Sequence, residues 1–224
     1  MKGRAAVAKY TFTDTQILDT EIGWEVMSDW EDPIMVKHAE VVTKNGGDIL
    51  ESGFGMGISA THIQSHDINS HTIIEINDEV YERLLIWAED KPNVIPVKGD
   101  WADSIPTDKK YDAVFYDPYG DMKNKPNFPW LIAPYCKEGA IVSWYNNILR
   151  PSSVYSEGYE HHHHYWDNDR ISYHEVELEI PEEARIKWYL EGEGNIYYAP
   201  EIIMGEQDNR DEFKRIWMGK RGPV

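Results

Sequence analysis

A glycine-rich segment with an acidic residue in front of it has the types and spacing to bind a ligand through its backbone. Residues 51–57 read Glu-Ser-Gly-Phe-Gly-Met-Gly, and glycines there allow a tight turn and a close backbone approach. The G-x-G-x-G spacing puts Ile58 where the dinucleotide fingerprint has its third glycine, and the segment lacks the Gly-Lys-Ser/Thr of a phosphate-binding P-loop. Glu51 would repel a pyrophosphate and attract an ammonium group.

Two further carboxylates follow predicted strands. Glu75 ends one of them, where a carboxylate can accept hydrogen bonds from ribose hydroxyls. Asp100 and Trp101 follow the next, where the carboxylate can accept from an exocyclic amino group and the indole can contact adenine. With the glycines, these residues suit a nucleoside that bears an amino acid and no phosphates. We therefore predict S-adenosylmethionine as the cofactor; ordinary turn glycines and surface acids are the alternative.

Apolar runs alternate with helical patterns through the middle of the chain. The predicted strands there cover residues 48–50, 72–76, 93–97, 111–116 and 139–144. The predicted helices cover 58–65 and 78–89, and prolines interrupt 125–136. Residues 170–180 and 195–204 alternate apolar with polar side chains, which predicts an added antiparallel pair. The order of elements predicts an α/β domain with a largely parallel sheet.

Several segments resemble motifs of class I S-adenosylmethionine-dependent methyltransferases, and in particular of the guanidinoacetate N-methyltransferase family. They are residues 26–35, 51–56, 73–78, 116–119 and 197–200. The resemblance implies a Rossmann-like fold, a seven-stranded, mostly parallel sheet with an antiparallel C-terminal strand. It also implies a set of cofactor contacts: Met27, Met35, Glu51, Gly53, Phe54, Gly55, Met56, Gly57, Ile58, Glu75, Asn77, Asp100, Trp101 and Asp117.

The same resemblance implies that Glu31 and Asp117 bind the acceptor's guanidino group. A guanidinium is planar and presents a fork of N–H donors, which carboxylates match. Asp117 is expected at the end of a parallel strand, and would accept a hydrogen bond from the attacking nitrogen while Glu31 holds another nitrogen. In the loop that follows the fifth strand, Asn146 is a candidate substrate contact. A turn-capping acid and a solvated acid are the alternative interpretations of Asp117 and Glu31.

The predicted activity is N-methylation of a small guanidino compound, with guanidinoacetate as the first candidate, giving creatine. A protein arginine N-methyltransferase is one alternative, although such an enzyme is expected to carry a further N-terminal domain. An enzyme acting on another small amine is a second, because Asp117-Pro118-Tyr119 is similar to the Asp-Pro-Pro-Tyr motif of enzymes that methylate exocyclic amines. A third alternative is a protein that binds S-adenosylmethionine without transferring the methyl group.

The composition of the chain limits which partners and which cellular compartment we expect. The chain has 22 basic and 40 acidic residues, a net charge of −18, which disfavours nucleic acid and anionic membranes as partners. No apolar run approaches the roughly 18 residues of a membrane span, and the first nine residues do not resemble a secretory signal. The single Cys136 fits a reducing compartment, so we predict a cytoplasmic location. We also expect a monomer or a homodimer.

The 224 residues suggest one main domain. We predict an N-terminal extension at 1–45 that forms a lid over the active site, a methyltransferase domain at 46–205 and a charged tail at 206–224. The run from His161 to His164 is interpreted as a solvated loop, because neighbouring side chains on an extended chain face opposite ways. No metal site is predicted.

Overall fold

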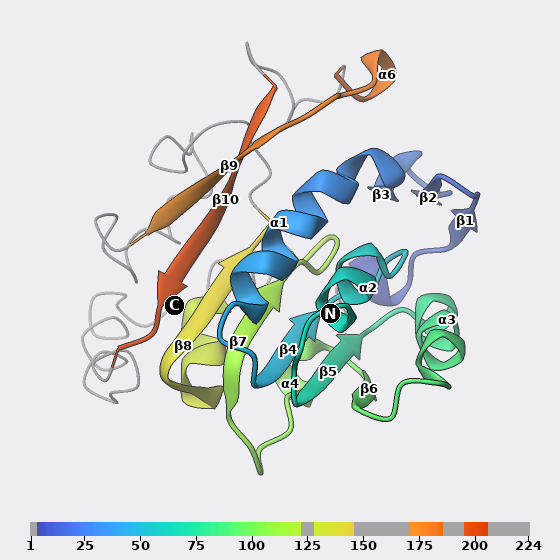
Figure 1. Ribbon diagram of the computed structural model, residues 1–224. Helices are drawn as coiled ribbons and strands as arrows, with labels where there is room; N and C mark the ends of the chain where they lie inside the picture. The colour runs from blue at the N-terminus through green and yellow to red at the C-terminus, as the bar shows by residue number, and fades with distance from the viewer. Residues whose placement is uncertain (1–3, 122–127, 146–170, 186–194, 206–224) are drawn as a thin grey trace, which may run out of the picture.

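A seven-stranded sheet forms the centre of the computed structural model, which describes residues 4–121, 128–145, 171–185 and 195–205 (Figure 1). Its strands are β4 (Asp48–Ser52), β5 (Ser70–Glu75), β6 (Val94–Lys98), β7 (Tyr111–Tyr116), β8 (Cys136–Trp144), β9 (Ser172–Glu177) and β10 (Ile196–Ile203). Three predictions fall outside the described residues, those for Asn146, for His161 to His164 and for the tail at 206–224.

The strand order is β6-β5-β4-β7-β8-β10-β9. Strands β4 to β8 pair in parallel, whereas β10 runs antiparallel to both β8 and β9. The predicted fold class and the predicted antiparallel pair are therefore confirmed. Strand β8 begins at Cys136 and not at residue 139, because fully buried Cys136 pairs with Tyr111 at the start of β7.

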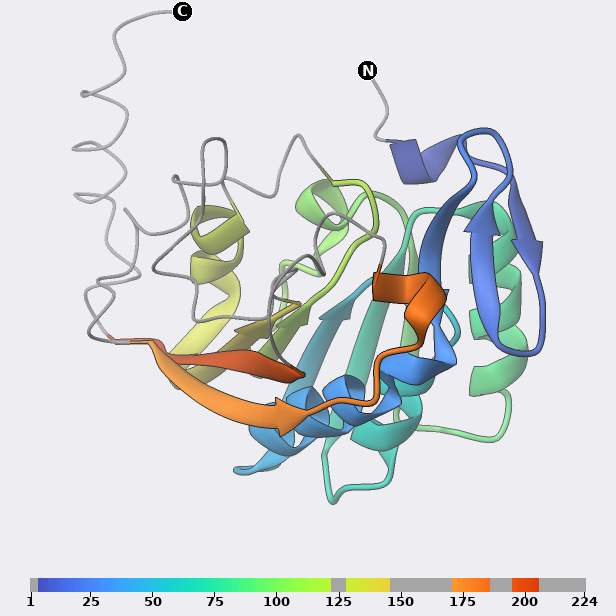
Figure 2. The ribbon, with the colours of Figure 1, turned by 90° about the horizontal axis from the view of Figure 1, so that it is seen from above.

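Helices cover both faces of the sheet (Figure 2). They are α1 (Asp32–Thr43), α2 (Ile58–Gln64), α3 (Asp78–Ala88), α4 (Trp101–Ser104) and α5 (Phe128–Ile132), and a short helix α6 (Glu182–Arg185) follows β9. Successive side chains of a strand face opposite ways, so Ile49 joins the core beneath α1 and α2 whereas Leu50 joins the core beneath α4 and α5. No helix of the described residues is long and apolar enough to cross a membrane.

The N-terminal residues, for which no element was predicted, form a second sheet and a helix. The elements are η1 (Arg4–Ala6), β1 (Tyr10–Phe12), β2 (Gln16–Asp19), β3 (Trp24–Ser28) and η2 (Asp29–Glu31), and α1 follows them. Tyr10 and Ile17 share a buried cluster with Val80 and Leu84 of α3, and Figure 2 shows this small sheet beside that helix. Helix α1 buries Met35 against the large sheet. The lid itself stays a prediction.

A buried polar chain links α1 to β8 and β10. Ser143 donates its hydroxyl hydrogen to the carbonyl of Pro200 (2.6 Å), so the Nδ1–H of His38 must be the donor in its 2.7 Å bond to Ser143. The Nε2 of His38 then accepts from the Tyr197 hydroxyl (3.0 Å). Burial, with a smaller effect from the charge of His174, lowers the pKa of His38 to about 3.

We expect His38→Gln to flatten the pH dependence of stability. His38 is neutral when folded, whereas an unfolded histidine takes up a proton near pH 6.5. Below that pH the unfolded state binds more protons, so stability is lost as the pH falls from about 6.5 toward 3. From pH 7.5 to 5.0 the wild type should lose about 2 kcal/mol more unfolding free energy than the variant. Urea unfolding of both proteins at the two pH values measures this, and equal losses would contradict it.

Candidate active site

The predicted glycine loop lies between β4 and α2 and runs against the end of β7. Gly53, Gly55 and Gly57 all have positive φ (89°, 55° and 75°). A β-carbon at Gly53 would lie 2.5 Å from the backbone oxygen of Asp117, so the two backbones meet with no room for a side chain. The Asp117 amide also donates to the carbonyl of Ser52 (3.1 Å). The structure thus brings the loop and Asp117 together.

Glu75, the last residue of β5, is fixed beside this loop. Its Oε2 accepts the amide of Phe54 (2.9 Å) and its Oε1 accepts the amide of Asn77 (2.7 Å). Burial raises the pKa of Glu75, although the amides of Asn77, Phe54 and Ile76 and the charge of Lys98 oppose that shift. Each carboxylate oxygen has a second lone pair, so the oriented group can still accept a bond from a ligand hydroxyl.

Two predicted cofactor contacts direct their side chains into the protein. The Asn77 side chain caps α3, where Oδ1 accepts two amides of the first turn, and its amide group donates to the carbonyls of Ala5 and Ala8. The ring of Phe54 is buried and lies 5.4 Å from that of Trp87. The backbone amides of Phe54 and Asn77 orient Glu75, while their side chains pack elsewhere.

Glu51 is also directed inward. Its side chain is fully buried; Oε1 accepts the hydroxyl of Ser59 on α2, and Oε2 lies 2.9 Å from Nε2 of His71 on β5. The carboxylate therefore bonds the end of β4 to α2 and lies against His71 of β5. Sequence reasoning missed both partners, because each is many residues away from Glu51.

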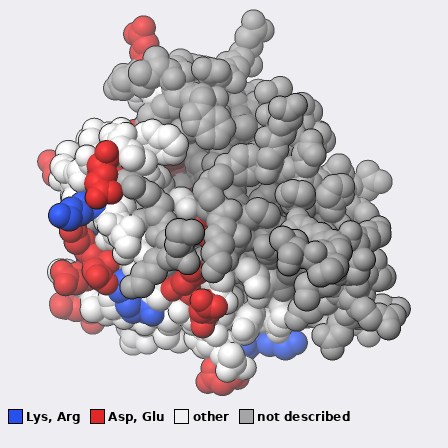
Figure 3. Space-filling model, turned by 180° about the vertical axis from the view of Figure 1, so that it is seen from behind, with Lys and Arg blue, Asp and Glu red and all other residues white. Residues whose placement is uncertain are grey.

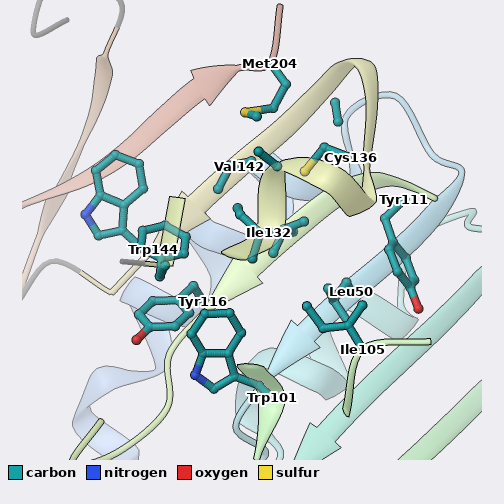
Figure 4. Packing of buried hydrophobic residues seen from close by; sticks show 14 of the residues in the cluster. Leu50, Trp101, Ile105, Tyr111, Tyr116, Ile132, Cys136, Val142, Trp144 and Met204 are labelled. Carbon is teal, nitrogen blue, oxygen red and sulfur yellow. The ribbon is translucent and has the colours of Figure 1, made fainter. Parts of the chain in front are cut away.

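Asp100 and Trp101 lie where β6 passes into α4. Asp100 caps this helix by accepting an amide of its first turn (3.1 Å). Figure 4 shows Trp101 beside Tyr116. Their rings meet edge to face, with the centroids 5.1 Å apart. Oδ2 of Asp121 accepts both the indole N–H of Trp101 (2.6 Å) and the hydroxyl of Tyr116 (2.8 Å). Burial and the Asp121 charge raise the pKa of Tyr116 well above its ordinary range. Sequence reasoning did not identify Asp121.

The predicted methionine contacts share one apolar cluster with the end of the loop. Met27 of β3 and Met35 of α1 are buried there, and Met56 and Ile58 pack against them. The sulfur of Met27 accepts the amide of Met56 (3.3 Å). A β-carbon at Gly55 would lie 2.6 Å from that sulfur. The N-terminal residues therefore contact the glycine loop directly.

Glu31 is joined to the end of β7 through the residue that follows β8. It ends η2, is 7% exposed, and accepts the amide of Ser28 (3.0 Å) and the hydroxyl of Tyr145 (2.6 Å). The amide of Tyr145 donates to the carbonyl of Tyr116 (3.0 Å), the residue before Asp117. One signal for Glu31 was present in the sequence, since Ser28 and Glu31 have the spacing of a capping box.

The described residues fit the cofactor that the sequence predicts. The glycine loop is a cradle that a β-carbon would fill at Gly53 and Gly55. Glu75 lies at the carboxyl end of the neighbouring strand with its carboxylate oriented by amides. Asp100 follows the next strand. In an open α/β sheet, ligands bind at this edge, so one nucleoside would meet all three elements.

Comparisons with known proteins support this interpretation. The family model described as guanidinoacetate N-methyltransferase matches residues 1–128. Protein arginine N-methyltransferase 2 of Yarrowia lipolytica is 34% identical over 126 residues, which are 50% of this chain and 26% of that protein. Its namesake of Saccharomyces cerevisiae is 32% identical over 162 residues, 66% of this chain and 39% of that protein. The chain thus spans a quarter to two fifths of the length of these relatives.

Solved structures share the fold. An O-methyltransferase from Bacillus cereus in complex with SAH has a TM-score of 0.53 at 12% identity, over 80% of this chain and 82% of that one. The N-methyltransferase NodS from Bradyrhizobium japonicum has a TM-score of 0.52 at 10% identity, over 79% and 97%. The family model covers more than half of the 224 residues. The chain therefore belongs to the guanidinoacetate N-methyltransferase family, a family of S-adenosylmethionine-dependent methyltransferases.

Proposed function

We propose that this protein methylates a nitrogen of a small guanidino compound, with guanidinoacetate as the first candidate. The observation that carries the proposal is the connected pair of carboxylates. Glu31 is buried and bonded to Tyr145, whose amide is bonded to the residue before Asp117. Two carboxylates on one cation offset its desolvation, and together they match a planar fork of N–H donors.

When bound, S-adenosylmethionine supplies an activated methyl group on a sulfonium sulfur. The acceptor nitrogen must present a lone pair to that carbon and lose a proton as the C–N bond forms. Asp117, beside the glycine loop, would accept the N–H hydrogen bond and then the proton. Glu31 would hold the far side of the guanidino group. Positioning of this kind can contribute about 7–11 kcal/mol to lowering the barrier.

Arginine within a protein is the second candidate acceptor. The relatives from Yarrowia lipolytica and Saccharomyces cerevisiae carry the name protein arginine N-methyltransferase 2. An arginine side chain presents the same guanidino group, so the same two carboxylates suit it. The net charge of −18 also favours a cationic acceptor, and Figure 3 shows acidic side chains gathered on the described part of one face.

Calorimetry followed by a transfer assay tests the proposal. S-adenosylhomocysteine is titrated into the protein, and guanidinoacetate, an arginine-containing peptide or a simple primary amine is then titrated into the saturated complex. Each acceptor is next incubated with S-adenosylmethionine, and a product heavier by one methyl group is sought by mass spectrometry. We expect binding and transfer with a guanidino acceptor. Transfer to the primary amine alone, or to no acceptor, would overturn the proposal.

Glu31→Gln and Asp29→Asn form a matched pair for this assay. Both remove one negative charge from η2, but Asp29 is exposed whereas Glu31 is buried against Tyr145. We expect Glu31→Gln to weaken guanidino binding by about tenfold or more, because a charge-assisted hydrogen bond contributes about 1.5–3 kcal/mol. Asp29→Asn should leave that affinity unchanged. Equal effects of the two would show that Glu31 acts only through the overall charge.

We also propose that residues 1–45 act as a cover for the cofactor. The contact of Met27 with the amide of Met56 supports this, since it joins β3 to the glycine loop. A cover excludes water and strengthens the electrostatic interactions beneath it. Because Tyr10, Ile17 and Met35 are core residues, deletion of the whole segment would also remove packing. Met27→Ala is the milder test, and slower transfer without unfolding is the expected result.

A further inference from the structure

We propose that Tyr145 is a positioning residue that orients Glu31 and so sets the preference for a planar guanidino group over an ammonium group. This inference rests on the proposed function. Its basis is the 2.6 Å bond from the Tyr145 hydroxyl to Oε1 of Glu31, which spans 114 residues of sequence. Nothing in the spacing of the two residues or in the predicted elements requires this contact.

The carboxylate of Glu31 is held from two sides. Oε2 accepts the backbone amide of Ser28 (3.0 Å), which is the contact that a capping box supplies. A helix cap needs only that one oxygen. The Tyr145 hydroxyl adds a second, charge-assisted bond on Oε1. With one donor on each oxygen, rotation of the carboxylate plane is restrained.

Tyr145 is itself held in place by the sheet. Its amide donates to the carbonyl of Tyr116 (3.0 Å), and its ring centroid lies 5.8 Å from that of Tyr197. Tyr197 is 2% exposed and donates to His38, which in turn donates to Ser143. The Tyr145 ring therefore packs against Tyr197, a member of the buried polar chain that links α1, β8 and β10.

A fixed carboxylate plane discriminates by geometry. A guanidinium donates two parallel N–H bonds in one plane, so its bidentate pairing depends on how the carboxylate is rotated. An ammonium is a compact point charge with three rotatable donors, so its pairing depends much less on that rotation. Loss of the Tyr145 hydroxyl should therefore weaken a guanidino ligand more than an amine of similar size.

Tyr145→Phe tests the inference, with Tyr111→Phe as the matched control. Tyr111 also loses a hydroxyl bond, to Thr72 (3.3 Å), but it lies at the start of β7, whereas Asp117 follows the end of that strand. The probes are methylguanidine and methylamine, titrated into the complex with S-adenosylhomocysteine. We expect Tyr145→Phe to raise the Kd of methylguanidine about tenfold, with the affinities for methylamine and S-adenosylhomocysteine unchanged. Tyr111→Phe should change none of the three.

A second measurement separates positioning from a general structural effect. In a Glu31→Ala background, Tyr145→Phe should cause no further loss of methylguanidine affinity, because its effect passes through Glu31. Three results would overturn the inference. They are a full loss of methylguanidine affinity on adding Tyr145→Phe to Glu31→Ala, an unchanged methylguanidine Kd in Tyr145→Phe alone, and an equal loss of affinity for methylguanidine and methylamine in Tyr145→Phe alone. If the wild type binds S-adenosylhomocysteine but no guanidine, the proposed function fails first. If the wild type binds methylguanidine and Tyr145→Phe binds it equally well, only the role of Tyr145 fails.

Discussion

Asp117→Asn is expected to lower kcat for methyl transfer by about 10²- to 10⁴-fold, the range for loss of a positioned proton acceptor. The amide that replaces the carboxylate keeps the size of the side chain but cannot take up the proton released when the C–N bond forms. The Asp117 backbone, which closes on the glycine loop through its carbonyl, and its amide bond to Ser52 are retained. Affinity for S-adenosylhomocysteine should therefore change little.

Single-turnover kinetics measure the methyl-transfer step, and calorimetry measures S-adenosylhomocysteine affinity in the same protein. Asp103→Asn is the matched control, because Asp103 is an exposed acid on α4. It should leave both quantities unchanged. If Asp117→Asn lost rate and cofactor affinity in equal measure, Asp117 would be a binding group for the cofactor. If it lost neither, Asp117 would be an acid that only caps the turn after β7.

The central strands were predictable because they are buried on both faces, which gives each a short apolar run between turn residues. Helix α3 was predictable for a similar reason, since Asn77 caps it and Val80 and Leu84 repeat along its buried face. Two regions gave no such signal. Strands β1 to β3 have only three to five residues each, too few to establish an alternating pattern. Helix α1 buries His38 among apolar residues, and this polar residue interrupts the apolar repeat.

Some features of the candidate site were likewise predictable from the sequence, and others were not. Gly53 and Asp100 follow β4 and β6, and Glu75 ends β5, so the sequence places all three at one edge of the sheet once the strands are known. The contacts that orient the side chains are long-range. Tyr145 meets Glu31 only because β8 ends beside η2, and Asp121 meets Trp101 only because the segment after β7 returns to α4. Local sequence patterns do not predict such contacts, because they depend on how distant elements pack together.

Gly53→Ala is expected to be the most damaging single change in the loop. At Gly53, φ is +89°, a conformation that costs a residue with a side chain about 1–2 kcal/mol. The added β-carbon would also lie 2.5 Å from the Asp117 carbonyl oxygen and 3.3 Å from Cα of Pro118, both backbone atoms. Relieving such overpacking typically costs a further 1–3 kcal/mol. The unfolding free energy should fall by about 2–5 kcal/mol in total.

Gly139→Ala separates these two causes. Its φ is +80°, nearly that of Gly53, but a β-carbon there would meet nothing within 4 Å. It should therefore lose only the conformational part, about 1–2 kcal/mol by urea unfolding, and keep its S-adenosylhomocysteine affinity. Gly53→Ala must displace either the loop or the backbone of Asp117, so calorimetry should also detect weaker S-adenosylhomocysteine binding. Equal losses in the two variants would mean that φ alone requires glycine at Gly53, and that the loop and Asp117 are not coupled through their close approach.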